Sequence, residues 1–382
     1  MASAGALAVV ANRPESLMAK ENETKVKQFP FYRATGTHRQ LGQQHGEQAK
    51  EHIRAHIDFM CESMKLTREE LRGRALKFQP MFEKYCSHLL DEIKGLGEGA
   101  GITFADALAT NIRGALNKAT DGGCTAFVVS PRGTADEQIL IGQNSDMLPA
   151  AIDLAYVLHL KPKDKPEALI WTFGGMISYH GINRHGVGYF ANDVGGGPKP
   201  RFAMPHYPLK RLMLECETLD EVQEFLHRVP VWANGNYVLC DGRGKILDVE
   251  TTTDGPHMVN DNGAGFIAHS NHFVCAKHAT DENFKLSAAD SFARLDRMNE
   301  LIKSRFGKLG VDDFKSFLRD RDGDPSGICR SAQTDNPTAH WTSNSITVAS
   351  IIAEPKRRQL HVAVGNDAKS PFVVYRMDGN SD

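Results

Sequence analysis

The first third of the chain carries apolar residues at helical spacing. Between residues 38 and about 118 they recur every three or four positions, with polar residues between them. This pattern predicts helices over 38–64, 67–96 and 104–116. The glycine-rich stretch from Gly95 to Gly101 is expected to separate the last two. The first 27 residues are mostly small or polar, so they are predicted to be disordered.

The pattern changes at Cys124. From there on, short β-branched and apolar runs bounded by glycine, proline and aspartate predict antiparallel hairpins. The expected strands are 124–129, 139–146, a strand ending at Asn192, 237–240, 246–249, 265–268, 346–354 and 359–364. Helices are predicted to return at about 208–227, 288–306 and 312–319. The mixture indicates an α+β fold. The chain shows no linker and no internal repeat, so we expect one domain made of a helical part, 28–123, and a part spanning 124–382.

The link between Gly123 and Cys124 is the candidate for chemistry. Two glycines precede a cysteine that starts an apolar strand, and glycines can adopt strained backbone angles that let a thiol attack the preceding carbonyl. Cleavage there would leave Cys124 with a free α-amine. Since an α-amine titrates near pH ~8, it could serve as the base for its own thiol. The alternative is a flexible turn leading into a buried cysteine.

Polar residues at the ends of other predicted strands are candidate partners of this cysteine. The hairpin formed by 124–129 and 139–146 brings Asp146 back towards Cys124, although Asp146 is also suited to an ordinary turn. Asn192 ends one strand, and Asn271 follows another within His269-Ser270-Asn271-His272-Phe273.

The order of these motifs resembles the penicillin acyltransferase family (acyl-coenzyme A:6-aminopenicillanic acid acyltransferase), which also contains N-β-alanyl dopamine hydrolase. These are autoproteolytic N-terminal nucleophile (Ntn) cysteine hydrolases. The resemblance runs from Phe31 to about Gly365. Its motifs begin at Gly36-Thr37-His38 and include Gly-Cys-Thr, Gly-Gln-Asn-x-Asp, Gly-x-Asn-x-x-Gly, Asn-His-Phe and Ile-Cys-Arg. It implies a four-layer αββα Ntn sandwich of two stacked antiparallel sheets flanked by helices.

The resemblance also implies site residues. Cys124 matches the autoprocessing nucleophile, with Gly123 before the cut, Asp146 matches the active-site aspartate, and Asn271 matches the oxyanion-hole asparagine. Candidates for support or substrate binding are Asn144, Asn192 and Arg330. The family arginine before the last hairpin aligns with Asn344, so a fixed positive charge is expected to be missing there unless Arg330 supplies it.

Charge and composition exclude several function classes. The 45 basic and 47 acidic residues give a net charge of −2, without a basic block, which argues against binding nucleic acid or anionic membrane. No apolar run approaches the ~20 residues of a transmembrane helix, and the apolar run at residues 6–11 lacks the preceding basic residues of a secretory signal. Seven cysteines without CxxC spacing fit unpaired thiols, and we expect a cytoplasmic protein.

No cofactor or metal is predicted. The histidines His180, His185, His269 and His272 lie near the motifs, but they lack the helical i, i+4 spacing of a zincin. Gly195-Gly196-Gly197-Pro198 lacks the Lys-Ser/Thr of a phosphate loop and is expected to form a mobile loop at the rim of a pocket. The aromatic residues of 171–173 and 189–190 are expected in the core.

The sequence thus predicts an autoprocessed cysteine amidohydrolase or acyltransferase. Cys124 would attack the amide carbonyl of a small N-acyl compound and form a thioester, with hydrolysis favoured over transfer because water is always available. The partners would be the small amide substrate and the chain's own α and β fragments, 1–123 and 124–382. The alternatives are a binding or scaffold protein that keeps the fold without processing, and an unprocessed enzyme that uses Cys124 internally. The oligomeric state is not predicted.

Overall fold

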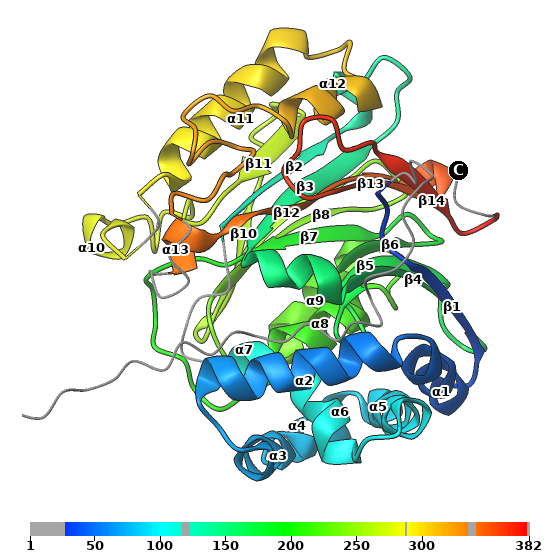
Figure 1. The fold of residues 1–382 in the computed structure, drawn as a ribbon. Helices are drawn as coiled ribbons and strands as arrows, with labels where there is room; N and C mark the ends of the chain where they lie inside the picture. The colour runs from blue at the N-terminus through cyan, green and yellow to red at the C-terminus, as the bar shows by residue number, and fades with distance from the viewer. Residues whose placement is uncertain (1–26, 117–122, 287–288, 335–340, 380–382) are drawn as a thin grey trace, which may run out of the picture.

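Two stacked β-sheets lie between two layers of helices in the computed structural model (Figure 1), which describes residues 27–116, 123–286, 289–334 and 341–379. The larger sheet has the strand order β1 (Phe31–Gly36), β4 (Ala155–Pro162), β5 (Ala168–Phe173), β6 (His180–Asn183), β7 (Gly188–Asn192), β8 (Gly235–Cys240), β9 (Ile246–Thr252), β10 (Gly255–Val259). The smaller sheet has the order β11 (Phe266–His269), β2 (Cys124–Val129), β3 (Leu140–Met147), β12 (Ile346–Glu354), β13 (Gln359–Val364), β14 (Val373–Arg376). The predicted α+β sandwich of two stacked sheets is confirmed. One pair differs from the expected antiparallel pattern, because β1 runs parallel to β4.

The helices cover the outer faces of the sheets. On the larger sheet lie α1 (His38–Gln48), α2 (Lys50–Met64), α3 (Arg68–Leu76), α4 (Gln79–Tyr85), α5 (Ser87–Ala100), α6 (Phe104–Thr110), α7 (Arg113–Leu116), α8 (His206–Met213) and α9 (Leu219–Arg228). The helices beside the smaller sheet are α10 (Asp281–Phe284), α11 (Ser291–Arg305), α12 (Val311–Phe317) and α13 (Trp341–Asn344). Within the described parts of the chain, no helix has the length and apolar character needed to span a membrane.

Three apolar cores separate the four layers. Leu41 and Ile93 pack with the outer face of the larger sheet, and Val128 and Trp171 belong to the core between the two sheets. The third core joins the smaller sheet to α11 and α12, where the rings of Phe127 and Phe314 stack with centroids 3.9 Å apart. Because both faces of the central strands are covered, β2 and β3 are buried at every position.

Several predicted helices are divided in the structure. The helix expected over 38–64 breaks at Ala49 into α1 and α2, the one over 67–96 becomes α3, α4 and the start of α5, and 208–227 becomes α8 and α9. Strands β1, β4, β5, β6, β10 and β14 were not predicted from the sequence. The disorder predicted for the first 27 residues concerns residues 1–26, which lie outside the described residues.

Of the glycines predicted to separate two helices, only Gly101 does so, as the left-handed C-cap of α5 before α6; Gly95, Gly97 and Gly99 lie inside α5. A Cβ on Gly95 would lie 2.1 Å from the carbonyl oxygen of Arg39, and one on Gly42 of α1 would lie 1.8 Å from the carbonyl oxygen of Glu92. The two helices therefore touch backbone to backbone. Here glycine is required for close helix packing, although it costs helix propensity.

Candidate active site

The β2–β3 hairpin brings the cysteine and the aspartate together. Cys124 is the first residue of β2 and pairs with Ser145 of β3, so Asp146 lies beside the Gly123–Cys124 link. The backbone N–H of Asp146 donates to the carbonyl oxygen of Gly123 at 2.9 Å. The register of one hairpin thus places the aspartate where the sequence predicted it.

The backbone of Cys124 is held on both sides. Its N–H donates to Oδ1 of Asn271 at 3.0 Å. Its carbonyl oxygen accepts from Oγ of Ser270 at 3.1 Å and from Nη1 of Arg294 at 2.7 Å. Ser270 and Asn271 directly follow β11, the strand that pairs with β2. The atom that cleavage would turn into an α-amine therefore already has an oxygen acceptor.

Arg294 is a site residue that the sequence patterns did not reveal. Besides the Cys124 carbonyl, its guanidinium donates to Oγ1 of Thr125 at 2.9 Å and to Oδ1 of Asn271 at 2.7 Å. Its side chain is 1% exposed, and Asp290, four residues earlier, accepts from its Nε at 3.1 Å. The sequence does contain a sign of this role, because Arg294 has helical spacing with Met298 and Ile302 and shares the buried face of α11 with them. A cation in an apolar stripe must be paired or functional.

The carboxylate of Asp146 lies between a hydroxyl and a guanidinium. Thr347 donates from Oγ1 to Oδ1 at 2.7 Å, and Nε of Arg330 lies 3.4 Å from Oδ2. Burial raises the pKa of Asp146 to about 6, although the charges of Arg330 and Arg294 pull it down. This carboxyl group therefore titrates close to neutral pH.

The fixed positive charge that was expected to be missing at Asn344 is supplied by other residues. Arg330 is buried, and it also contacts Asp290, which joins it to the Arg294 side of the site. Asn344, just before β12, is itself buried. The structure therefore agrees with the alternative in which Arg330 supplies a positive charge, and Arg294 of α11 adds a second guanidinium group at this site.

The thiol itself is poorly ionised in the intact chain. Burial and, to a smaller extent, the neighbouring charge of Asp146 together raise the pKa of Cys124 to about 12, against lowering effects of the Asp146 N–H, Arg294 and Lys210. A thiol in this state is a weak nucleophile at neutral pH. The site therefore needs a base close to Cys124.

The structure requires glycine at position 123 because a larger side chain would not fit, and not because the backbone has a positive φ angle. It is not among the described glycines with positive φ, so the strained conformation expected from the sequence is not seen. A Cβ at this position would lie 3.1 Å from Oδ2 of Asp146 and 3.3 Å from Nη2 of Arg330. Glycine allows the chain to pass between these two charged side chains.

The three asparagines have different places. Asn271 contacts Cys124 as described, and its Nδ2 donates to the carbonyl oxygen of Asp193 at 2.9 Å. Asn192 lines the same cavity as Cys124, and its buried Oδ1 has no hydrogen-bond partner among the described residues. Asn144 instead donates to the carbonyl oxygens of Leu318 and Ile328 at 2.7 and 2.9 Å. The structure thus separates Asn144, which ties β3 to the outer loops, from the other two.

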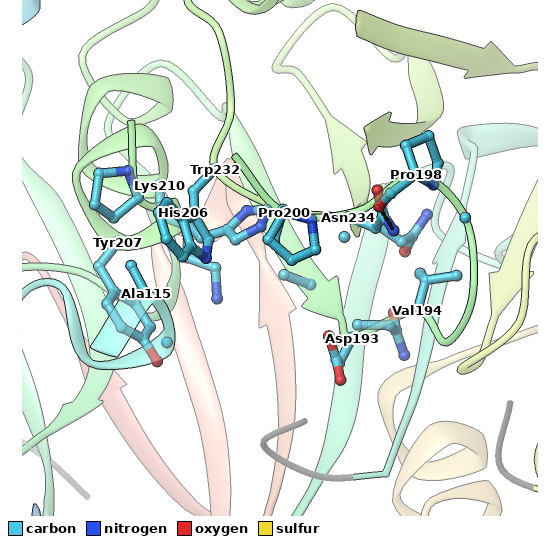
Figure 2. A pocket seen from close by; sticks show the side chains of 18 of the residues that line it. Ala115, Asp193, Val194, Pro198, Pro200, His206, Tyr207, Lys210, Trp232 and Asn234 are labelled. Carbon is cyan, nitrogen blue, oxygen red and sulfur yellow. Dashed lines mark hydrogen bonds between the residues drawn. The ribbon is translucent and has the colours of Figure 1, made fainter. Parts of the chain in front are cut away.

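A cavity of about 960 Å³ opens beside the cysteine. Figure 2 shows His206, Tyr207 and Lys210, all from α8, on one side of it, and Asn234 and Pro198 on the other. The wider wall is apolar, with the ring of Phe78 4.8 Å from that of Phe202 and 5.4 Å from that of Trp232, measured between centroids. Its size and lining are those of a small-molecule site.

The charges around the cavity are mainly positive. Four of the described lining residues are cations, and Asp193 is the lining carboxylate; the cations are Arg74, Lys77, Lys199 and Lys210. Lys210 is buried in the wall, with Nζ 4.3 Å from the centre of the Tyr179 ring. A cavity of this kind favours a ligand with negative charge.

The glycine loop predicted at the rim lines the cavity. Its chain is held by Nδ2 of Asn234, which donates to the carbonyl oxygen of Gly196 at 2.6 Å, and by the N–H of Gly197, which donates to Oδ1 of Asn283 at 2.8 Å. A Cβ on Gly197 would lie 2.8 Å from the Phe273 ring. The loop is thus pinned at two points.

The four histidines considered as metal ligands, His180, His185, His269 and His272, do not form a cluster. His269 bonds Glu250 at 2.9 Å, and although burial lowers its pKa, the charges of Asp248 and Glu250 raise it above the ordinary value. His272 bonds Oγ of Ser291 instead. In the described parts of the chain, none of the four belongs to a cluster with metal-ligand spacing.

Comparisons with known proteins agree with this architecture. The family model described as acyl-coenzyme A:6-aminopenicillanic acid acyl-transferase matches residues 133–369, more than half of the chain. That span contains Asp146, Asn271, Arg294 and Arg330, and it begins after Cys124.

One solved structure shows the same fold at low sequence identity, and two further solved structures match with lower scores. A variant of the conjugated bile acid hydrolase from Clostridium perfringens has a TM-score of 0.50 at 14% identity, covering 67% of this chain and 95% of that one. A second variant of it has a TM-score of 0.49 at 12% identity with the same coverage. Penicillin V acylase from Agrobacterium tumefaciens has a TM-score of 0.44 at 12% identity, covering 63% and 83%.

Proposed function

Because the chain belongs to the acyl-coenzyme A:6-aminopenicillanic acid acyl-transferase family, we propose that it is a cysteine amidohydrolase or acyltransferase activated by cleavage between Gly123 and Cys124. The observation that carries the proposal is the position of Cys124. It starts a strand, lines a cavity of about 960 Å³, and has its N–H bonded to Oδ1 of Asn271.

In the proposed self-cleavage, the thiol of Cys124 attacks the carbonyl carbon of Gly123. Negative charge then grows on the Gly123 oxygen, which already accepts the N–H of Asp146 at 2.9 Å. One preorganised donor of this kind contributes roughly 3 kcal/mol. The C–N bond breaks, the nitrogen of Cys124 takes up the thiol proton, and Gly123 becomes a thioester. Water hydrolyses the thioester and leaves Cys124 with a free amine and thiol.

In turnover, the α-amine accepts the thiol proton and the thiolate attacks the carbonyl carbon of the substrate amide. The leaving amine takes that proton, and a thioester remains on Cys124. Water then gives the carboxylic acid, or a second amine gives a transferred amide. We propose that hydrolysis predominates.

The supporting residues divide the work. Asn271 and Arg294 hold the backbone of Cys124, so that the amine keeps its position relative to the thiol. Asp146, whose pKa is raised to about 6 by burial, is mostly ionised at neutral pH and provides a negative neighbour for the new ammonium group. The side-chain amides of Asn271 and Asn192 stabilise the negative charge that develops on the substrate carbonyl oxygen. Asn192 lines the cavity.

The cavity favours amides with a sizeable apolar group and a negative charge. Its aromatic wall, with Phe78, Phe202 and Trp232, suits the apolar group, and Lys210 with the cations at the rim suits the negative one. The binding or scaffold alternative would keep the fold without needing the contacts that converge on one peptide link. The unprocessed alternative leaves a thiol whose burial raises its pKa to about 12.

Intact mass spectrometry under denaturing conditions, beside a Cys124→Ala variant, tests self-cleavage. Two fragments splitting at Gly123 and Cys124 in the wild type alone are expected. An uncut mass in both would overturn processing. A panel of N-acyl amides, followed by separate detection of acid and transferred amide with and without added amine, then tests turnover. A cleaved protein that consumes none of the panel, and whose Cys124 resists thiol-directed labelling, would favour the binding-protein alternative.

A further inference from the structure

A cluster of metal-ligating side chains lies on the helical layer beyond the larger sheet, in α1, α5 and the segment after α8. It consists of His38, His88 and Glu215, whose ligand atoms all lie within 4.8 Å of one another. His38 begins α1, His88 stands in the first turn of α5, and Glu215 follows α8. Three separate segments thus bring two imidazoles and a carboxylate to one point.

The tautomer of His38 is set by a buried carboxylate. Nδ1 of His38 lies 2.9 Å from Oε2 of Glu92, so this nitrogen carries the hydrogen and donates it. The opposite nitrogen, Nε2, is left with its lone pair. A carboxylate behind a histidine is the arrangement that orients metal-binding imidazoles in proteins.

Nε2 of His38 is also buried without a hydrogen-bond partner among the described residues. The side chain is 7% exposed, and Oδ1 of Asp164, in the loop between β4 and β5, lies 3.6 Å from this nitrogen. Ligands about 2.0 Å from a tetrahedral zinc ion are roughly 3.3 Å apart. Asp164 has nearly this spacing to His38 but is not one of the three residues whose ligand atoms all lie within 4.8 Å of one another, so its exposed side chain would turn towards the ion to become a fourth ligand.

The charged groups around this cluster leave a net negative charge that favours binding of a cation. Glu92, Asp164 and Glu215 are carboxylates, and they are opposed by Arg211, whose Nη1 is 3.4 Å from Glu215, and by Lys165 at 3.6 Å. One negative charge remains in excess when both histidines are neutral. Lys165 is partly exposed and can turn away from Glu215 into solvent.

We propose that this cluster binds one divalent transition-metal ion of the Zn²⁺ type. The ligands are Nε2 of His38, an imidazole nitrogen of His88 and the Glu215 carboxylate, with Asp164 as the fourth. Imidazole and carboxylate ligands in this number match zinc. His38 and His88 precede the Gly123–Cys124 link, whereas Asp164 and Glu215 follow it. The ion would therefore tie the helical segment before the link to the sheet segment after it, whether or not the link is cut.

The test uses the full chain without a histidine tag, stripped with a chelator and titrated with Co²⁺ and with Zn²⁺. We expect one ion per chain, visible d–d bands of tetrahedral Co²⁺ without thiolate charge-transfer bands, and a melting temperature raised by roughly 4 °C at 100-fold excess over Kd. His88→Gln should weaken binding by at least about 100-fold and Asp164→Asn by about 10-fold.

The matched control is His185→Gln. His185 is an exposed histidine whose Nε2 is 4.0 Å from a carboxylate, Glu217, but it lacks the other ligands. Its variant should bind the ion like the wild type. Absence of the tetrahedral Co²⁺ spectrum in the wild type would overturn the proposal. Unchanged affinity in Asp164→Asn and His88→Gln would do the same, because the ion would then sit elsewhere, such as on the cysteines. Asp164 is 65% exposed, so its variant keeps the test valid even if His88→Gln folds poorly.

Discussion

Two buried clusters of arginines and carboxylates lie in opposite layers of the molecule. The arginines of the two clusters donate their hydrogen bonds to different kinds of acceptor. Near the smaller sheet, Arg294 and Arg330 pair with Asp290 and Asp146. In the other helical layer, the fully buried Arg211 lies between Glu92 and Glu215. The first cluster directs hydrogen bonds at the backbone of Cys124, whereas the second joins side chains of separate helices.

The difference shows what distinguishes a reactive site from a structural one. Both clusters contain buried guanidinium groups, so burial of charge alone does not separate them. In the first, the charges surround a peptide link and a thiol at the edge of a cavity. In the second, they surround His38 and His88, which do not line that cavity. The groups that the buried arginines contact therefore distinguish the reactive site from the structural cluster.

The largest expected effect is that of Arg294→Met. It removes three hydrogen bonds around Cys124 and one guanidinium partner of the Asp290 carboxylate, which should cost about 3–5 kcal/mol of stability. Self-cleavage and amide hydrolysis should fall by at least about 100-fold, because the nucleophile is no longer held. Urea unfolding and timed mass spectrometry measure the two effects.

The matched control for that variant is Arg297→Met on the same helix. Arg297 pairs with Asp320 at the surface, with its side chain 28% exposed. The variant should lose about 1 kcal/mol or less and cleave normally. Equal loss of activity in both variants would mean that α11 as a whole, and not the contacts of Arg294, supports the site.

Arg211→Met should affect stability without affecting the thiol. Removing this guanidinium leaves Glu92 and Glu215 in a buried cluster, so we again expect a loss of about 3–5 kcal/mol. The rate of alkylation of Cys124 in the folded protein should stay within about twofold of the wild type. A slowed alkylation with unchanged stability would contradict the separation of the two clusters.

Asp146→Asn should change how stability depends on pH. Because burial raises the pKa of Asp146 to about 6 from an ordinary value near 4, the folded state favours the protonated form. The stability contributed by that proton is complete below pH ~4 and is lost as the pH rises through about 6, by on the order of 3 kcal/mol. The asparagine variant lacks this loss.

That experiment is best made in a Cys124→Ala background, so that both proteins are uncleaved. The free energy of unfolding is measured from pH 4 to 7 in each. The value for the protein that keeps Asp146, minus the value for the Asp146→Asn variant, should fall steadily with rising pH. A constant difference would show that the pKa of Asp146 is the same in the folded and unfolded chains, so that its contacts with Arg330 and Thr347 offset burial.

Local sequence patterns were enough for the hairpins but not for the helix breaks. Strands β2, β3, β12 and β13 follow from apolar runs with clear turns. The glycines around Gly95 wrongly predict a break, because a local pattern does not show that α1 comes within backbone contact of α5. Strands β4 and β5 are buried apolar runs like β2 and β3, but they were not predicted as strands.

For the site, the residues next to strand ends could be predicted and the residues on helices could not. Asp146 was placed near Cys124 by a predicted hairpin, and Asn271 was named from the family resemblance; the structure brings Asn271 to Cys124 because β11 pairs with β2. Arg294 and Lys210 reach the site from α11 and α8. Their positions depend on how whole helices pack on the sheets, which a local pattern does not determine. A site role for Asn144 was expected because its residue type suits both a ligand and a tie between loops, and its contacts are those of a tie.

The smallest expected effect is that of Gly123→Ala, and it tests why glycine precedes the nucleophile. The added Cβ would lie 3.1 Å from Oδ2 of Asp146 and 3.3 Å from Nη2 of Arg330. These side chains would have to move by a few tenths of an ångström, at a cost of about 1 kcal/mol, so self-cleavage should slow about fivefold.

Gly73→Ala is the matched control for Gly123→Ala. Gly73 lies inside α3 with nothing within 4 Å of an added Cβ, so its variant should gain roughly 0.5–1 kcal/mol of stability and cleave at the wild-type rate. Cleavage that is undetectable in Gly123→Ala would show that the reaction passes through a backbone conformation open to glycine alone. Cleavage at the wild-type rate would show that Asp146 and Arg330 do not confine the link. A fivefold effect agrees with the structure, in which glycine serves to let two charged side chains approach the bond that is to be cut.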